Sequence, residues 1–322
     1  KDLKKAQKIG DFDSEKTKFK NFDEENVVKI ILDIPSEISK LKKAFEEKKI
    51  ETFEADIIFA RRFLIDHKIQ GGIEVIGDFD LQEEVQVYRE PKIKPAQVKV
   101  DLKILSVDIE TDPKAKEIYC ISMAQDKFEK VLIRSSKKLK KAESFEDEED
   151  VLERFLELVK ELDPDIITGW NFIDFDLKVI RKRCQHFEIP FNLGKTNKES
   201  RLIVRKGFFA SSKMYAEGRQ VLDTMHLIKD TTKLENYRLE TASQHFVKEG
   251  KLLKGKGRFN EIEELFANNH QKLVDYNLKD SILVLKILEK SNVLALSITR
   301  SKLTGLLLDQ VKGNISSLDC IY

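Results

Sequence analysis

The apolar positions in the first part of the chain form short runs of mixed period, which predicts a small α+β domain over residues 1–95. A helix is expected where Ile38, Leu41 and Phe45 recur at a spacing of three to four residues. Short apolar segments bounded by polar residues indicate strands between the helical signals. The predicted strands of this domain are Val27–Leu32, Phe53–Ile58 and Ile73–Ile76.

A polar stretch around Pro91 and Pro95 separates this region from a longer one. Proline lacks a backbone N–H, so we expect both residues to interrupt strand pairing and to mark a domain boundary. The order of elements that follows is typical of the ribonuclease-H-like fold, a mixed α/β sheet with helices on its faces, which we predict for residues 96–300. The expected strands are Val98–Ile109, Ile118–Ala124, Lys130–Ile133 and Asp165–Thr168, and the arms of a possible hairpin are Arg201–Lys206 and Lys213–Leu222. Helices are expected around Val151–Val159, Phe175–Cys184, Ile262–His270 and Leu273–Leu296. Residues 137–150 are expected to form a charged surface loop.

Composition and charge narrow the class of protein only in part. The chain has 322 residues, of which 41% are hydrophobic, enough for two domains with real cores. Lys and Arg total 58 against 57 Asp and Glu, and the resulting charge of +1 neither favours nor excludes a nucleic-acid partner. Three widely separated cysteines exclude a cysteine-based zinc cluster and fit a reducing, cytoplasmic compartment. No apolar run reaches the roughly 18 residues of a membrane-spanning helix, so we expect no membrane partner.

The segment ILSVDIETD, Ile104–Asp112, has the pattern of a buried strand and yet carries two acids. Side chains alternate along a strand, so Asp108 and Glu110 point the same way, about 7 Å apart along the chain. Like charges so placed need a cation. A solvated strand end is the simpler explanation of this pair taken alone.

Two more acids stand in apolar contexts. Asp176 lies between Phe175 and Leu177 after a predicted buried strand, where a charge is costly unless it is paired or coordinated. A helix N-terminal charge is the alternative interpretation. Asp280 falls on an apolar helical stripe with Tyr276 one turn before it, although a local hydrogen bond or surface contact also explains that pair. The stripe consists of Leu273, Tyr276, Asp280, Val284 and Ile287.

Taken together, four acids predict a metal site: Asp108, Glu110, Asp176 and Asp280. A set of carboxylates without His or Cys favours hard cations such as Mg²⁺ or Mn²⁺ over zinc. Two such ions about 4 Å apart stabilise both the entering and the leaving oxygen of an in-line phosphoryl displacement. We therefore predict two Mg²⁺ or Mn²⁺ ions in one site.

Three motifs, in this order, resemble the exonuclease motifs of family B DNA polymerases. They are DIET at Asp108–Thr111, N-x-x-x-F-D at Asn171–Asp176 and Y-x-x-x-D at Tyr276–Asp280. The segments GWNFIDFDL, YNLKDSILV and EADIIFARRFLIDHKIQGGIEVIGDF are similar to the bacterial DNA polymerase II branch in particular, so the likeness covers nearly the whole chain. TGLLLDQVKGNISSLDCIY resembles the passage into a palm domain. We therefore expect residues 301–322 to begin that connection and the chain to be part of a longer protein.

The resemblance implies a role for each motif residue. It implies that Tyr276 orients the attacking water and that Thr111 and Asn171 lie near the terminal nucleotide of the DNA. The polymerase motifs D-x-x-S-L-Y and Y-G-D-T-D are absent from the 322 residues, so the chain is not expected to polymerise. The implied ligands of the two metal ions are Asp108, Glu110, Asp176 and Asp280, with Asp108 bridging the ions.

The expected function is 3′–5′ exonucleolytic hydrolysis of DNA, as in proofreading, with release of deoxynucleoside monophosphates. The resemblance implies a single-stranded or frayed 3′ DNA end as substrate, a sliding clamp as a partner of the full-length parent, and a nucleoid location in a bacterium. Two alternatives stay open: a non-cutting nucleic-acid-binding or docking module, and a free-standing ribonuclease-H-like nuclease.

The predicted hairpin offers candidate DNA contacts. Basic side chains there are suited to backbone phosphates, and aromatic rings are suited to stacking on a base. Surface lysines and core phenylalanines are the simpler interpretation. The candidates are Lys206, Lys213 and Arg219 for phosphates and Phe208 or Phe209 for stacking.

Overall fold

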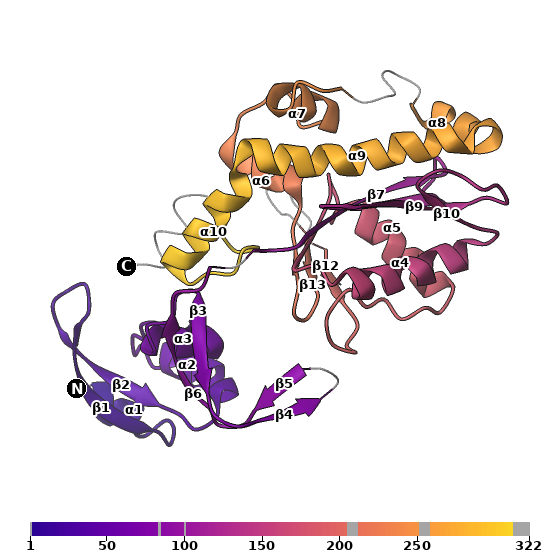
Figure 1. Ribbon diagram of the computed structural model, residues 1–322. Helices are drawn as coiled ribbons and strands as arrows, with labels where there is room; N and C mark the ends of the chain where they lie inside the picture. The colour runs from indigo at the N-terminus through magenta and orange to yellow at the C-terminus, as the bar shows by residue number, and fades with distance from the viewer. Residues whose placement is uncertain (1, 83–84, 100, 205–211, 251–257, 312–322) are drawn as a thin grey trace. The chain divides into compact units, whose positions relative to one another are not determined.

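The computed structural model describes residues 2–82, 85–99, 101–204, 212–250 and 258–311. The chain divides into two compact units, Lys1–Gln97 and Val98–Tyr322. Figure 1 shows the helices and strands that belong to each.

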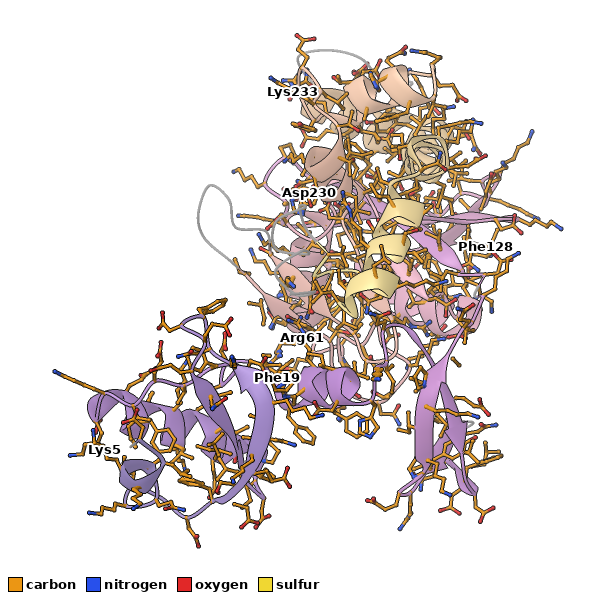
Figure 2. The ribbon with its side chains drawn as sticks, turned by 90° about the vertical axis from the view of Figure 1, so that its left-hand side faces the viewer. Lys5, Phe19, Arg61, Phe128, Asp230 and Lys233 are labelled. Atoms are coloured by element: carbon orange, nitrogen blue, oxygen red, sulfur yellow. The ribbon has the colours of Figure 1, made fainter. Side chains whose placement is uncertain are left out.

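The first unit combines short helices with three two-stranded antiparallel sheets. The sheets pair β1 (Asp13–Lys20) with β2 (Asn26–Ile31), β3 (Gly72–Ile76) with β6 (Lys92–Ala96), and β4 (Phe79–Gln82) with β5 (Val85–Tyr88), and the helices are α1 (Asp2–Ala6), the 3₁₀ turn η1 (Pro35–Glu37), α2 (Ile38–Glu47) and α3 (Phe59–Asp66). The expected helix around Phe45 is confirmed, and Phe45 forms a small core with Ala6 and Ile50. Outside this core many apolar side chains are exposed, such as Phe19 on β1 at 77% (Figure 2).

Two predictions for the first unit are wrong. Residues Phe53–Ile58 form turns instead of a strand, because Glu54 adopts a left-handed conformation and the N–H of Ile57 bonds back to its carbonyl. Pro95 does not interrupt pairing, since it lies within β6 opposite Ile73. Each strand of a two-stranded sheet has one edge that faces no other strand. A proline is tolerated there when its nitrogen, which carries no hydrogen, faces that edge and not the partner strand.

The second unit is built around a six-stranded mixed sheet in the order β10-β9-β8-β7-β11-β14. Three of the expected strands form an antiparallel meander: β7 (Ile104–Thr111), β8 (Ile118–Gln125) and β9 (Phe128–Arg134). On one side the short strands β11 (Ile166–Thr168) and β14 (Gln220–Val221) continue the sheet parallel to β7. On the other, β10 (Ala142–Phe145) pairs in parallel with β9.

Helices cover both faces of this sheet, as Figure 1 shows. α9 (His270–Ser291) crosses one face and packs on β7, β8 and β9, whereas α4 (Glu148–Leu162) and α5 (Asp176–His186) lie on the other. A mixed α/β sheet with helices on its faces is therefore confirmed. The remaining elements of the unit are α6 (Thr224–Thr231), α7 (Leu239–Phe246), α8 (Arg258–Asn268), α10 (Val293–Thr304) and the antiparallel pair β12 (Arg201–Ile203) and β13 (Lys213–Tyr215).

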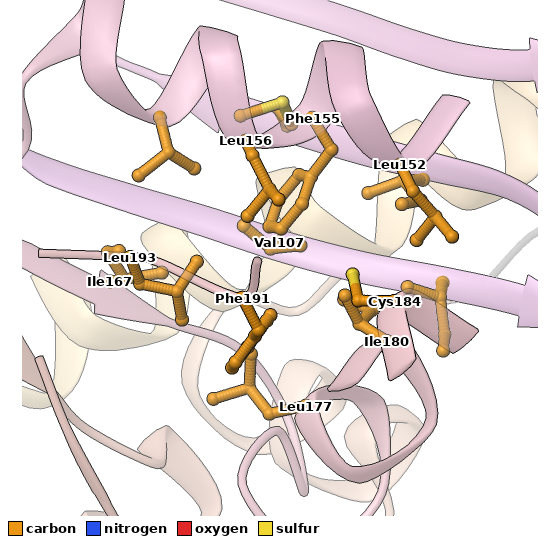
Figure 3. Close-up of a cluster of buried hydrophobic side chains, with 14 of the residues drawn as sticks. Val107, Leu152, Phe155, Leu156, Ile167, Leu177, Ile180, Cys184, Phe191 and Leu193 are labelled. Atoms are coloured by element: carbon orange, nitrogen blue, oxygen red, sulfur yellow. The ribbon is translucent and has the colours of Figure 1, made fainter. Parts of the chain in front are cut away.

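The alternation along β7 separates a hydrophobic face from an acidic one. Leu105, Val107 and Ile109 join the main core, which Figure 3 shows around Val107 with side chains of α4 and α5. Asp108 and Glu110 alternate with these residues along the strand and consequently point to the opposite face, which α9 covers. This places two carboxylates beneath a helix.

Three predictions for this unit are wrong. β7 begins at Ile104 and not at Val98, because its neighbour β11 begins opposite that residue. The predicted loop 137–150 contains β10, whose Phe145 packs against the main core. The long C-terminal helix ends at Ser291, since Asn292 adopts a left-handed conformation before α10 starts. None of the described helices has the length and apolar character needed to cross a membrane.

Candidate metal centre

The acidic end of β7 lies against β8 on one side and beneath α9. Asp108 is half-buried opposite Ser122 of β8, and Glu110, only 4% exposed, lies opposite Cys120. Burial raises the pKa of the Cys120 thiol well above its ordinary value, and the charges of Glu110 and Asp108 add to that effect. The thiol therefore stays protonated next to the carboxylates.

Helix α9 contributes the third acid. Its predicted apolar stripe is confirmed: Leu273, Tyr276, Val284 and Ile287 are all buried, and Asp280 among them is completely buried. One carboxylate oxygen each from Asp108, Glu110 and Asp280 lies within 4.8 Å of the others. Three like charges at this separation repel one another strongly when water is excluded, so the arrangement calls for a cation.

Asp176 lies on the neighbouring edge of β7. Strand β11 ends at Thr168, opposite Ser106, so it provides no partner for β7 at Ile109. Asp176 takes its place: its Oδ1 accepts a hydrogen bond from the Ile109 N–H at 3.1 Å. Burial raises the pKa of the Asp176 carboxyl well above its ordinary value, and the charge of Asp108 raises it further. The fourth predicted acid is thus an electrostatic neighbour of Asp108, although it is outside the 4.8 Å group found among the described residues.

The turn that carries Asp176 is tightly held. A Cβ on Gly169 would come within 2.4 Å of the Val107 carbonyl oxygen, so this position has no room for a side chain. Asn171 adopts a left-handed conformation at φ 60°, and its carbonyl accepts the Phe175 N–H. The carboxylate of Asp223, the N-cap of α6, accepts the Ile173 N–H at 3.2 Å.

The remaining predicted site residues are placed as follows. Tyr276 is completely buried, one turn before Asp280, in a cluster with Cys120 and Tyr119. Thr111 is buried at the end of β7, and its hydroxyl donates to the Asp112 carbonyl at 2.9 Å. Asn171 lies in the turn before Asp176.

Two of the candidate DNA contacts in the hairpin, Arg219 and Lys213, are paired with acids of this chain. Arg219 is only 7% exposed and donates to Asp163 and to the Pro164 carbonyl, so its proposed phosphate contact is wrong. The Lys213 side chain is 14% exposed and pairs with Asp309 at 2.8 Å. Lys206, Phe208 and Phe209 lie outside the described residues.

Sequence reasoning missed two polar residues at this centre. The Asn277 side-chain amide donates to Asp108 Oδ2 at 2.8 Å, and Asp223 holds the turn before Asp176. Asn277 directly follows the motif tyrosine, but only the packing of α9 on β7 brings it to Asp108. For Asp223, its place before a short helical segment was the available signal.

The donor set fits a divalent cation. All the acids offer oxygen, which is the ligand atom that Mg²⁺ and Mn²⁺ prefer, and no His or Cys belongs to the group of three found in the described residues. Asp108 is half-buried while Glu110 and Asp280 are buried, so the centre lies at the margin of the core.

Comparison with known proteins agrees with this geometry. Residues 50–242 match the family model "DNA polymerase family B, exonuclease domain". DNA polymerase II of Escherichia coli is 28% identical over 293 residues, covering 87% of this chain and 36% of its own length, and a DNA polymerase of Methanocaldococcus jannaschii is 29% identical over 265 residues, covering 82% and 15%. The chain thus spans about a third or less of these relatives.

A solved structure shows the same fold. The family B DNA polymerase from the archaeon Pyrobaculum calidifontis superimposes with a TM-score of 0.74 at 18% sequence identity, over 98% of this chain and 42% of that one. The ribonuclease-H-like architecture predicted from the order of elements is confirmed by this likeness together with the family match. Because the family model covers more than half of the 322 residues, the chain belongs to the family B DNA polymerases and contains their exonuclease domain.

Proposed function

We propose that this chain is the exonuclease-bearing part of a family B DNA polymerase and hydrolyses DNA from its 3′ end, releasing deoxynucleoside monophosphates. The observation that carries this proposal is the meeting of Asp108, Glu110 and Asp280 within 4.8 Å, with Asp176 on the adjacent strand edge. The family match gives the same reaction class from independent information.

We assign the four acids to the binding of two Mg²⁺ or Mn²⁺ ions. When bound, such ions lower the pKa of a water molecule and offset the charge on the departing 3′ oxygen. The protein supplies the negative charge that holds the ions and a partly dehydrated setting, since Glu110, Asp176 and Asp280 are all buried. In this proposal the Tyr276 hydroxyl orients the attacking water. The Tyr276 side chain is completely buried, one turn before Asp280 on α9.

A single-stranded or frayed 3′ DNA end is the proposed substrate. A mismatched end costs less to unpair than a matched one, which would favour its removal. By resemblance to the family's motifs, Thr111 and Asn171 are proposed to lie near the terminal nucleotide. Thr111 directly follows Glu110, and Asn171 lies in the turn before Asp176. A sliding clamp as partner of the longer parent and a nucleoid location remain predictions.

The domain assignment is likewise proposed: an N-terminal domain over residues 1–95, the exonuclease domain over 96–300 and a connecting segment from 301. The first boundary lies close to the division between the two compact units after Gln97. Helix α10, Val293–Thr304, runs through the second boundary.

The test is nucleotide release from 3′-labelled single strands of DNA and RNA, with and without Mg²⁺. We expect Mg²⁺-dependent release of mononucleotides from DNA, lost in Asp108→Ala and kept in Asp150→Ala. Asp150 is an exposed acid in the first turn of α4 and makes a matched control. Retention of DNA without release would instead identify a non-cutting binding module, and a preference for RNA would identify a different nuclease.

A further inference from the structure

Asn277 is a completely buried residue of α9 that faces the acidic centre. Its side-chain Nδ2 donates a hydrogen bond of 2.8 Å to Oδ2 of Asp108, across 169 positions of sequence. A carboxylate only accepts hydrogen bonds, so the nitrogen and not the oxygen of the amide must face it. The contact is therefore a directed bond to one oxygen of a proposed metal ligand.

The backbone of Asn277 is fixed to the sheet as well. Ser122 of β8, which lies opposite Asp108, donates through its Oγ to the Asn277 carbonyl at 3.0 Å. The same Oγ lies 2.6 Å from the hydroxyl of Ser281 on α9. Two points of attachment thus hold this turn of the helix at a fixed height above Asp108.

The chemistry of the amide suits a role in positioning. A lysine here would neutralise Asp108 and compete with a divalent cation, whereas an amide donates a hydrogen bond without bringing a charge. Because one carboxylate oxygen is bonded, rotation of the group is restricted while its negative charge is kept. Partners of this kind orient metal ligands in many proteins.

We propose that Asn277 is a positioning residue for Asp108: it holds this carboxylate in the orientation that binds the divalent cation. The inference rests on the proposed metal-dependent function. A residue that served packing alone would change the stability of the fold and leave the affinity for metal unaltered. Metal affinity is accordingly the property that separates the two roles.

The experiment is calorimetric titration of Mn²⁺ into the DNA-free protein, with thermal unfolding measured in parallel. Asn277→Ala is expected to weaken Mn²⁺ binding by about 10-fold or more, as is usual for loss of a partner that orients a ligand. The control is Asn192→Ala, the same change at another buried asparagine, whose side chain bonds Thr196 and Gly194. It is expected to lower the unfolding temperature while keeping Mn²⁺ affinity within about twofold of wild type.

A second variant guards against misfolding of the first. Asn277→Leu keeps the branching of the side chain at Cγ and fills the site, but it has no donor, and it is expected to weaken Mn²⁺ binding in the same way. Wild-type affinity in the folded Asn277 variants would overturn the positioning role while leaving the proposed function intact. Failure of the wild-type protein itself to bind Mn²⁺ would overturn the proposed function, and this inference with it.

Discussion

Substitution of Gly169 by alanine probes how closely the turn bearing Asp176 is fitted to β7. The new Cβ would meet the Val107 carbonyl oxygen at 2.4 Å and the Phe172 ring at 2.9 Å. Neither obstacle is the end of a flexible chain: one is backbone, and Phe172 is completely buried in the main core. The turn itself must therefore move.

The size of the movement follows from the contact distance. Ordinary contacts of a Cβ begin near 3.4 Å, so the turn must retreat by roughly 1 Å from β7. Asp176 sits at the far end of this turn, and its 3.1 Å bond to the Ile109 N–H would be stretched or lost. Overpacking of this kind costs about 1–3 kcal/mol of stability. A misplacement of about 1 Å in a catalytic site can reduce the rate about 100-fold.

The assay compares single-turnover release of nucleotides from 3′-labelled DNA with the unfolding free energy in urea. Gly194→Ala is the matched control, because its Cβ would also meet a backbone oxygen, that of Glu217 at 2.8 Å, in a loop apart from the acids. Both variants should lose stability, and only Gly169→Ala should lose about 100-fold in rate. A folded Gly169→Ala protein that releases nucleotides within about twofold of wild type would show that the fit of this turn against β7 does not position Asp176.

Three further predictions concern the acids and the core. Asp280→Asn should reduce nucleotide release by at least about 1,000-fold at unchanged DNA affinity, since it removes a buried charge from the metal-binding group; retention of activity in a rate assay would contradict the assignment. Arg183→Met should destabilise the protein by about 3–5 kcal/mol in urea unfolding, because it removes the bidentate partner of Glu148, whose side chain is only 5% exposed. Adding Glu148→Gln to this variant should recover part of the lost stability. Burial raises the pKa of Asp176 in the folded protein, so in EDTA this group contributes stability that is present below its unfolded pKa and lost as pH rises through its folded pKa. Asp176→Asn should abolish that part of the pH dependence of unfolding. The Mn²⁺ affinity of the wild type should fall as pH drops through the same range.

The candidate acids stand out in the sequence because they lie in otherwise apolar patterns. Asp108 and Glu110 share one face of a strand through its period of two, and Asp280 replaces an apolar residue on a helical stripe. Such exceptions in otherwise regular patterns are expected at functional sites. Their meeting in space follows from α9 packing across β7 and β8, which the order of elements predicts only as a class of fold.

Other features depend on contacts that no local pattern encodes. The bond from Asn277 to Asp108 joins a helix to a strand far away in sequence. Pro95 is accepted in β6 because, among the described residues, β3 alone pairs with that strand, which cannot be known until the sheet is assembled. The burial of Arg219 follows from its bonds to the Asp163–Pro164 corner, whereas its sequence context resembles an exposed hairpin.

The most direct test of the account is to locate manganese by anomalous diffraction in crystals grown with Mn²⁺. We predict density for Mn²⁺ at coordination distance from the carboxylate oxygens of Asp108, Glu110 and Asp280, with Asp176 completing the site. A map that contains no Mn²⁺ at these carboxylates, at a concentration that supports nucleotide release, would rule out the proposed metal site.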